Sequence, residues 1–207
     1  MFVAVQRLND GARAALSAHF RALPEHDRRL RFGAALSPEA VAAYVAGIDF
    51  DRDAMFGVYD DGLLLIGVAH LAFADGFAEL GISVLPEHRC HGAGSALFGR
   101  GAAHARNRFV SKLYMHCLSE NLAIMHIARR SRMEIVVDSG DADAHLALAP
   151  ASPASITDEF LTDQLALCDY ALKANLAAWS GIRAALDDDR GPGRVPDSGG
   201  ERAPALQ

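Results

Sequence analysis

The chain has 207 residues, 51% of them hydrophobic, which is enough to bury the core of one compact domain with a short appendage. Its formal charge of −6 and pI of about 5.8 argue against a general nucleic-acid binder, which would carry a basic face. A local basic pocket for an anionic ligand stays compatible with this balance.

The chain shows no sign of export or of a membrane partner. The three cysteines, Cys90, Cys117 and Cys168, are odd in number and lack a close motif spacing, so neither a disulfide framework nor a metal site is expected. No apolar run reaches the roughly 20 residues of a membrane-spanning helix. Met1–Arg7 is too short for the apolar part of a signal peptide. We therefore expect a cytoplasmic protein with reduced thiols.

The first fifty residues predict a strand and two helices. The expected elements are a strand at Phe2–Leu8, a helix at Ala12–Leu23 that Pro24 ends, and a helix from Ser37-Pro38 to about Ala46. The charged stretch His26–Phe32 between the helices is interpreted as a solvated loop, with the rim of a binding site as the alternative.

Three apolar segments joined by tight turns predict an antiparallel meander. The strands are Ala54–Tyr59, Leu63–Phe73 and Phe77–Val84, and the turns contain Asp60-Asp61-Gly62 and Ala74-Asp75-Gly76. The middle strand is almost continuously apolar, so we expect it to be central and buried on both faces.

The third strand runs into a glycine-rich turn, Val84–Leu97, that opens a helix reaching about Arg108. Gly92 and Gly94 follow Arg89 there, and such a turn directs backbone N–H groups and the positive end of a helix dipole at one spot. The pattern predicts a nucleotide-bearing cofactor bound at Arg89–Ser95. A Walker A loop, a nucleophile elbow and a Rossmann fingerprint each lack a required residue.

After this helix the sequence predicts a strand, a helix and two more strands, followed by a helical extension. The expected elements are strand Lys112–Leu118, helix Leu122–Arg130, strand Ile135–Val137, acidic turn Asp138–Asp143, strand Ala144–Ala149, and one or two helices over Ile156–Leu186. We expect residues 1–149 to form the domain, 150–186 a helical extension and 187–207 a disordered tail.

These residues resemble the GNAT superfamily of acyl-CoA-dependent N-acetyltransferases. Its signature is Gln or Arg, two residues, Gly, one residue, then Gly or Ala, and Arg89, Gly92 and Gly94 fit it at a strand-to-helix turn after a meander. Cys117–Asn121 and the helix to Met133 resemble the next family motif. The resemblance covers roughly residues 5–149 and is nearest to the bacterial protein-lysine acetyltransferase-like branch.

The resemblance implies an α/β (α+β) fold with a mixed, mostly antiparallel twisted sheet flanked by helices, and acetyl-CoA as co-substrate. It implies Glu79 as the catalytic base and a backbone N–H near Leu85, at a bulge of the strand, as oxyanion donor. The implied cofactor-binding residues are Val84, Leu85, Arg89, Cys90, His91, Gly92, Ala93, Gly94, Ser95 and Asn121. Asn121 alternatively serves as a plain helix N-cap.

Two departures from the family pattern leave alternatives open. Arg132 replaces a glycine that often ends this helix, and Ala128 stands where many members carry a tyrosine that protonates the departing thiolate. Either another residue substitutes for that tyrosine or no acid is needed; the candidates are Tyr114, His116, Cys117, Ser119 and His126. We therefore expect an N-acetyltransferase for a small-molecule amine or a protein lysine, with a non-catalytic acyl-CoA-binding module as the alternative. By family analogy, the loops at 28–32, 48–53 and 138–143 shape the acceptor site. The apolar residues of 156–186 pack either on the domain or on a second copy, as a homodimer.

Overall fold

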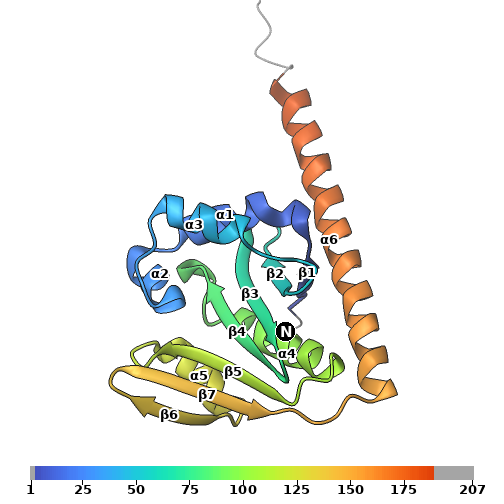
Figure 1. The fold of residues 1–207 in the computed structure, drawn as a ribbon. Helices are drawn as coiled ribbons and strands as arrows, with labels where there is room; N and C mark the ends of the chain where they lie inside the picture. The colour runs from blue at the N-terminus through green and yellow to red at the C-terminus, as the bar shows by residue number, and fades with distance from the viewer. Residues whose placement is uncertain (1–2, 189–207) are drawn as a thin grey trace, which may run out of the picture.

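The computed structural model describes residues 3–188, which form one seven-stranded sheet covered by helices (Figure 1). The strands are β1 Gln6–Leu8, β2 Ala54–Tyr59, β3 Leu65–Ala74, β4 Phe77–Val84, β5 Lys112–Leu118, β6 Glu134–Asp138 and β7 Asp141–Ala147. The α-helices are α1 Arg13–Ala22, α2 Glu25–Phe32, α3 Pro38–Ala46, α4 Ala93–Asn107, α5 Leu122–Arg130 and α6 Pro153–Asp188. Two 3₁₀ turns lie at η1 Asp10–Ala12 and η2 Pro86–His88.

The sheet has the order β1-β2-β3-β4-β5-β7-β6, and only the β4–β5 pair is parallel. The predicted mixed, mostly antiparallel sheet and the meander β2-β3-β4 are confirmed. Residues 65–69 of β3 are all buried, as a central strand covered on both faces requires.

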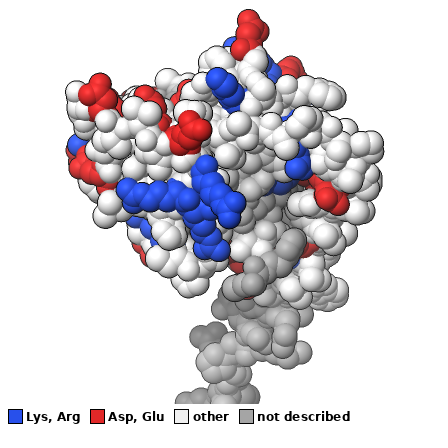
Figure 2. Space-filling model, turned by 90° about the horizontal axis from the view of Figure 1, so that it is seen from below, with Lys and Arg blue, Asp and Glu red and all other residues white. Residues whose placement is uncertain are grey.

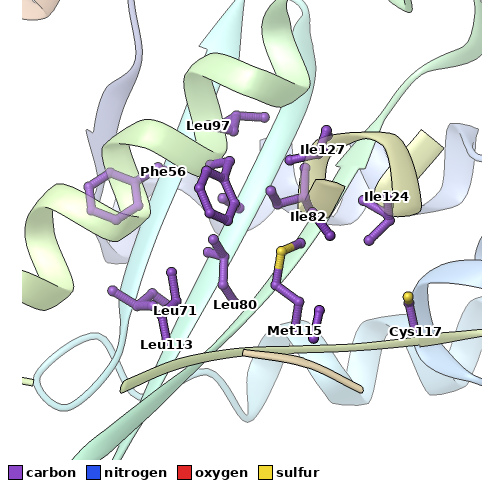
Figure 3. Close-up of a cluster of buried hydrophobic side chains, with 14 of the residues drawn as sticks. Phe56, Leu71, Leu80, Ile82, Leu97, Leu113, Met115, Cys117, Ile124 and Ile127 are labelled. Atoms are coloured by element: carbon purple, nitrogen blue, oxygen red, sulfur yellow. The ribbon is translucent and has the colours of Figure 1, made fainter. Parts of the chain in front are cut away.

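Each face of the sheet has its own apolar core. On one face α4 and α5 cover a cluster that joins β4 and β5 residues to both helices, and Figure 3 shows Ile82, Met115, Ile124 and Ile127 in this cluster. On the other face a second cluster joins α1 and α3 to the meander through residues such as Phe20 and Val41. Alternate residues of β4 therefore face opposite sides: Ala78, Leu80 and Ile82 face α4, and the residues between them face away.

The segment predicted as a solvated loop is helix α2, so that prediction was wrong. Pro24 does not only end α1; it is also the N-cap residue of α2. Glu25 and Asp27 lie in the first turn and Arg29 and Arg31 in the last, which complements the helix dipole. Gly33 ends the helix with φ 74°, a conformation that glycine adopts without strain.

Several element boundaries also differ from the predictions; β3, for example, spans Leu65–Ala74 rather than Leu63–Phe73. β1 is confined to Gln6–Leu8, the only part that pairs with β2. The expected acidic turn at Asp138–Asp143 is a two-residue turn at Ser139-Gly140, because Asp138 and Asp141 already pair across β6 and β7. The C-terminal helical segment is one helix, α6.

Helix α6 leaves the sheet and rises along one side of the molecule (Figure 1). Its first turns contact α4 and its middle contacts β1. Among the helices of residues 3–188, none combines the length and hydropathy needed to cross a bilayer. Most of the predicted disordered tail, residues 189–207, lies outside the described residues.

Candidate active site

The candidate site is the place where β4 and β5 part. The two strands pair only at Phe77–Glu79 with Lys112–Tyr114, although β4 continues to Val84 and β5 to Leu118. Figure 1 shows the strands diverging beyond that point. The main-chain edges that face each other there have no strand partner, so an extended ligand with amide groups can pair with both.

The glycine turn lies just beyond the end of β4 and caps the open side of this divergence. Gly92 is the N-cap residue of α4 with φ 89°, and no side chain caps the helix. Cys90, His91 and Ser95 are exposed around it, so the first-turn N–H groups face solvent rather than a side chain. Gly94 packs on α5: a Cβ added there would lie 3.0 Å from Ile127 Cδ1. The arrangement is an uncapped helix N-terminus, the kind of site that suits an anion.

Arg89 braces this turn instead of projecting freely from it. Its Nε donates to the Val84 carbonyl oxygen at 3.1 Å, and Nη2 pairs with Asp27 Oδ2 of α2 at 2.8 Å. Asp27 is largely buried, so part of the Arg89 charge is already balanced within the protein. The contact ties α2 to the glycine turn.

The main-chain N–H group of Leu85 is not available as an oxyanion donor, because it donates to the Ile66 carbonyl oxygen at 2.9 Å. The expected bulge in β4 is also absent: the register with β3 runs unbroken from Phe77 to Val84. Since hydrogen bonding alternates along an antiparallel strand, the N–H groups of Ile82 and Val84 point away from β3, toward the divergence.

Glu79 occupies the last paired position before the strands part, opposite Tyr114 of β5. Its side chain is exposed on the sheet face away from α4. His116 lies on the same face of β5, where Asp143 of β7 is its register partner and hydrogen-bonds Nδ1 at 2.5 Å. This bond, together with smaller effects of nearby carboxylates including Glu79, raises the pKa of His116. The divergence therefore carries an open carboxylate, Glu79, on the same sheet face as an imidazole whose pKa is raised.

Comparison with known proteins identifies this architecture. A model of the acetyltransferase (GNAT) family matches residues 18–131, more than half of the chain. The chain belongs to the GNAT acetyltransferase family. Searched against curated proteins, its sequence has no match.

Solved structures with the GNAT fold are similar to this chain at low sequence identity. The GNAT domain of S. lividans PAT aligns with 70% of this chain and 89% of its own at 19% identity, with a TM-score of 0.60. Salmonella typhimurium yncA, solved with acetyl-CoA, aligns with 73% of this chain and 97% of its own at 14% identity, with a TM-score of 0.55. Spermidine N-acetyltransferase from Vibrio cholerae, in complex with CoA and spermine, aligns with 70% of this chain and 95% of its own at 17% identity, with a TM-score of 0.56. These likenesses show the GNAT fold of the chain.

The residues of the second GNAT motif, Cys117, Asn121 and Ala128, are buried and have structural partners. Asn121 is buried; its Oδ1 caps α5 by accepting from the Ile124 N–H at 3.2 Å, and its Nδ2 lies 3.4 Å from the Leu30 carbonyl oxygen of α2. Ala128 is buried in the α4–α5 core, and Cys117 lies in the same core, where burial raises the pKa of its thiol. Tyr114 and His116 face the Glu79 side instead.

Basic residues at the end of α5 are a feature that the sequence reasoning missed. Arg129 and Arg130 close the helix and Arg132 follows it, all three exposed. Figure 2 shows Lys and Arg side chains gathered on the face seen from below, where α5 and β6 lie in Figure 1. Ile127, one turn before Arg130, touches Gly94, so this basic group is close to the N-terminus of α4. An arginine run near the end of an amphipathic helix was the available signal.

Helix α2 is the second missed feature, and it contacts both β4 and β5. Its Asp27 pairs with Arg89 of the glycine turn, and its last turn places Arg31 over β4: a Cβ at Gly81 would lie 2.5 Å from Arg31 Cζ. The segment is thus a helix packed against β4 and β5, and its alternative assignment to the rim of a binding site stays a prediction.

Proposed function

We propose that the chain transfers an acetyl group from acetyl-CoA to a primary amine by direct attack within a ternary complex. The observation that carries the proposal is the parting of β4 and β5 directly after Glu79, with the uncapped N-terminus of α4 beyond it. Coenzyme A needs such a site, because its pantetheine arm has amide groups for strand edges and its pyrophosphate suits a helix N-terminus.

In this proposal the turn Arg89–Ser95 holds the pyrophosphate through main-chain N–H groups. Cys90, His91, Gly92, Ala93, Gly94 and Ser95 supply the turn, and Arg89 holds its shape. Arg129 and Arg130 add positive charge for the remaining phosphate. The edges of β4 and β5 bind the arm, with the N–H group of Val84 or Ile82 donating to the thioester oxygen. Asn121 acts by starting α5 at the edge of the site.

The chemical step requires a base, because an alkylamine with a pKa near ~10.4 arrives protonated. Glu79, directly or through a water, accepts that proton. The amine nitrogen then attacks the thioester carbon, the C–S bond breaks, and the sulfur leaves with the electron pair. The second proton, which the nitrogen loses as the amide forms, goes to the departing thiolate directly or through water. A thiol of pKa near ~8.5 is a tolerable leaving group, so Ala128 in place of a tyrosine does not block the reaction.

Replacing Glu79 by glutamine tests the base. Near neutral pH, kcat/KM for the amine should fall about 100-fold, and the loss should shrink at high pH, where the amine is already deprotonated. The KM for acetyl-CoA should stay unchanged. Glu39→Gln, on the exposed face of α3, is the matched control. Full turnover of Glu79→Gln at every pH would remove Glu79 from the mechanism.

The second candidate function is an acyl-CoA-binding module without turnover, which the alanine at position 128 favours. Calorimetry with CoA, together with thiol release from acetyl-CoA over a panel of amines and lysine peptides, separates the two. Thiol release with any amine supports the enzyme, whereas tight CoA binding without release on the whole panel supports the module.

The finer assignments stay predictions. They are membership of the protein-lysine branch, a cytoplasmic location, and a homodimer. The exposed apolar side chains of α6, among them Phe160, Leu172 and Trp179, are the surface on which a second copy would pack. Light scattering of the purified chain measures the oligomeric state, and a monomer at high concentration would contradict the dimer.

A further inference from the structure

Arg31, in the last turn of α2, lies against the strand that carries Glu79. Its guanidinium covers Gly81 so closely that a Cβ there would sit 2.5 Å from Cζ and Nη2 and 2.6 Å from Nη1. Gly81 and Glu79 are on the same face of β4, since they are two residues apart, about 7 Å along the strand. The proposed base and the guanidinium therefore flank one stretch of open β4.

The positive charge of Arg31 has no carboxylate partner within residues 3–188. Two neighbouring arginines are paired, Arg29 with Glu120 and Arg89 with Asp27. Arg31 is half-buried, no ion pair includes it, and its Nε is buried without a hydrogen-bond partner. The Phe32 ring, whose centroid lies 4.9 Å from Arg31 Cζ, stabilises this charge in part, and a bound anion would stabilise it further. The planar donor fork of a guanidinium matches a carboxylate.

A chain of hydrogen bonds holds Arg31 in this position. Arg31 Nη2 lies 3.4 Å from Tyr44 Oη, Tyr44 Oη lies 2.7 Å from His70 Nδ1, and His70 Nε2 lies 3.0 Å from Asp53 Oδ2. Burial lowers the pKa of His70, and the charge of Arg31 adds to the effect against the pull of Asp53. A neutral His70 donates to Asp53 and accepts from the Tyr44 hydroxyl, which leaves the Tyr44 oxygen to accept from Arg31.

At the Asp53 end of this hydrogen-bond series the charge has partners, and at the Arg31 end it has no carboxylate partner among residues 3–188. Asp53 is buried and also receives a hydrogen bond from Arg52 at 3.1 Å, so its charge is matched there. Burial would raise the pKa of Asp53, but the bonds from Arg52 and His70 hold it below the usual value. The remaining, unmatched charge is that of Arg31, beside Glu79.

We propose that Arg31 binds the carboxylate of the acceptor, so that the acetylated substrate is an amino acid whose amine lies at Glu79. This inference rests on the proposed function and narrows it. An amino acid carries a carboxylate and an ammonium group close together. Its carboxylate would face the cation of Arg31 while its ammonium group faces the carboxylate of Glu79. A diamine would bring a second cation to Arg31 and is disfavoured.

Matched pairs of acceptors test the proposal with the full chain and acetyl-CoA. Each pair is an amino acid and its decarboxylated amine, such as lysine with cadaverine and phenylalanine with phenethylamine. The wild-type chain should prefer the amino acid at least about tenfold in kcat/KM. In Arg31→Gln the KM for amino acids should rise about 10- to 100-fold, the range expected for a lost charge-assisted contact. Amine turnover and the KM for acetyl-CoA should not change.

Three further variants control for folding and position. Arg31→Lys keeps the charge without the fork and should retain part of the preference. Tyr44→Phe removes the positioning hydroxyl and should raise the amino-acid KM less than Arg31→Gln does, with kcat preserved. Arg21→Gln, exposed at the end of α1, should behave as wild type.

The outcomes separate this inference from the function beneath it. Preference of the wild-type chain for the decarboxylated amines overturns the carboxylate site and leaves acetyl transfer intact. An Arg31→Gln effect confined to acetyl-CoA, or equal for both members of each pair, also overturns it. A chain that binds CoA and acetylates no amine on the panel refutes the proposed function, and the inference with it.

Discussion

Glu79, Gly81 and Ser83 follow one another along the same face of β4, and each meets a different environment. Glu79 is open, Gly81 lies under Arg31, and Ser83 is buried with its Oγ 2.8 Å from His19 Nε2. His19 Nδ1 lies 2.9 Å from the Leu65 carbonyl oxygen, so both ring nitrogens are engaged. His19 is thus a structural histidine, and Glu79 is the residue of this face that a substrate amine can reach.

His19 predicts how the stability of the domain depends on pH. Burial lowers its pKa to about 4, against a smaller opposite effect of its bond to Leu65. The unfolded chain takes up this proton near pH 6.5 and the folded chain only near 4, so stability should fall as pH drops through that range, by about 3 kcal/mol at most. Urea unfolding at pH 7.5 and 4.5 measures it. His19→Gln should show a smaller difference, with His70 supplying the rest; an unchanged difference would contradict the assignment.

Two glycines inside α4 predict opposite effects of the same substitution. Gly99 is exposed with no atom within 4 Å of an added Cβ, whereas at Gly101 the Cβ would lie 2.9 Å from Leu80 Cδ1 in the core. Gly99→Ala should therefore stabilise the chain by about 1 kcal/mol, the helix-propensity gain. Gly101→Ala should destabilise it, because crowding of a close-packed core outweighs that gain. The thermal unfolding midpoints of the two variants, compared with wild type, test this prediction. If both substitutions stabilise the chain, α4 does not pack on β4 as described.

At the scale of elements, helices α4 and α5 end in the same hydrogen-bonded motif, and in each a residue other than glycine occupies the left-handed position. After α5, the Met133 N–H bonds the Ala128 carbonyl and the Arg132 N–H bonds the Arg129 carbonyl, and Arg132 has φ 57°. After α4, Phe109 takes the equivalent place with φ 62°. These are Schellman motifs, in which the left-handed position favours glycine. The glycine that Arg132 replaces in the family pattern therefore had a conformational role, and the helix end keeps its geometry without it.

Replacing Arg132 by glycine should stabilise the chain by about 1 kcal/mol, because a left-handed backbone strains residues that carry a Cβ. Phe109→Gly should act in the same direction, since its side chain is 82% exposed and contributes little packing. The unfolding free energy from urea titration measures both. A loss of stability in Arg132→Gly, together with unchanged CoA affinity, would mean that the arginine side chain contributes more than its backbone costs.

Local signals made most elements predictable from sequence. The bounds of β2, β4, β5, α3 and α5 match the expected ones, because turns, an N-cap serine followed by proline, and Asn121 mark them. Helix α2 has only Leu30 and Phe32 as apolar residues, so it shows no periodic stripe, and its charges suggested a loop. The cofactor turn and Glu79 could be proposed from a motif, whereas Arg31 over Gly81 and Asp27 at Arg89 arise from the docking of α2, which no local pattern encodes.

At the scale of the molecule, α6 is attached through a buried polar network. Glu159 contacts His104 Nδ1 at 2.5 Å, Arg100 at 2.8 Å and Asn107 at 2.6 Å, and Asp163 pairs with the same arginine. Arg100 and His104 are nearly inaccessible on α4. The helix has 36 residues, about 54 Å, so this network fixes its first turns to the domain. Further along the helix, Lys173 Nζ donates to the Tyr59 carbonyl oxygen at 3.0 Å.

Glu159→Gln should release this attachment, with the largest effect near neutral pH. Burial would raise the pKa of Glu159, but the bonds from His104, Arg100 and Asn107 hold it far below the ordinary value of 4.5. A depressed carboxyl pKa contributes stability above pH 4.5 that is lost as pH falls toward the folded-state value. The variant should therefore be about 3 kcal/mol less stable at pH 7, because one of the two carboxylates on Arg100 and the charged bonds to His104 and Asn107 are lost from a largely buried network, and the difference should narrow below pH 4.5.

Urea unfolding of wild type and Glu159→Gln at pH 7 and pH 3.5, followed by far-UV circular dichroism, measures the effect. Asp169→Asn is the control on the same helix, because its ion pair with Lys173 is partly exposed and should contribute less than about 1 kcal/mol at either pH. Equal stability of Glu159→Gln and Asp169→Asn at pH 7 would contradict the attachment. If Glu159→Gln also leaves acetyl-CoA turnover unchanged, α6 is a structural appendage whose release does not reach the divergence of β4 and β5.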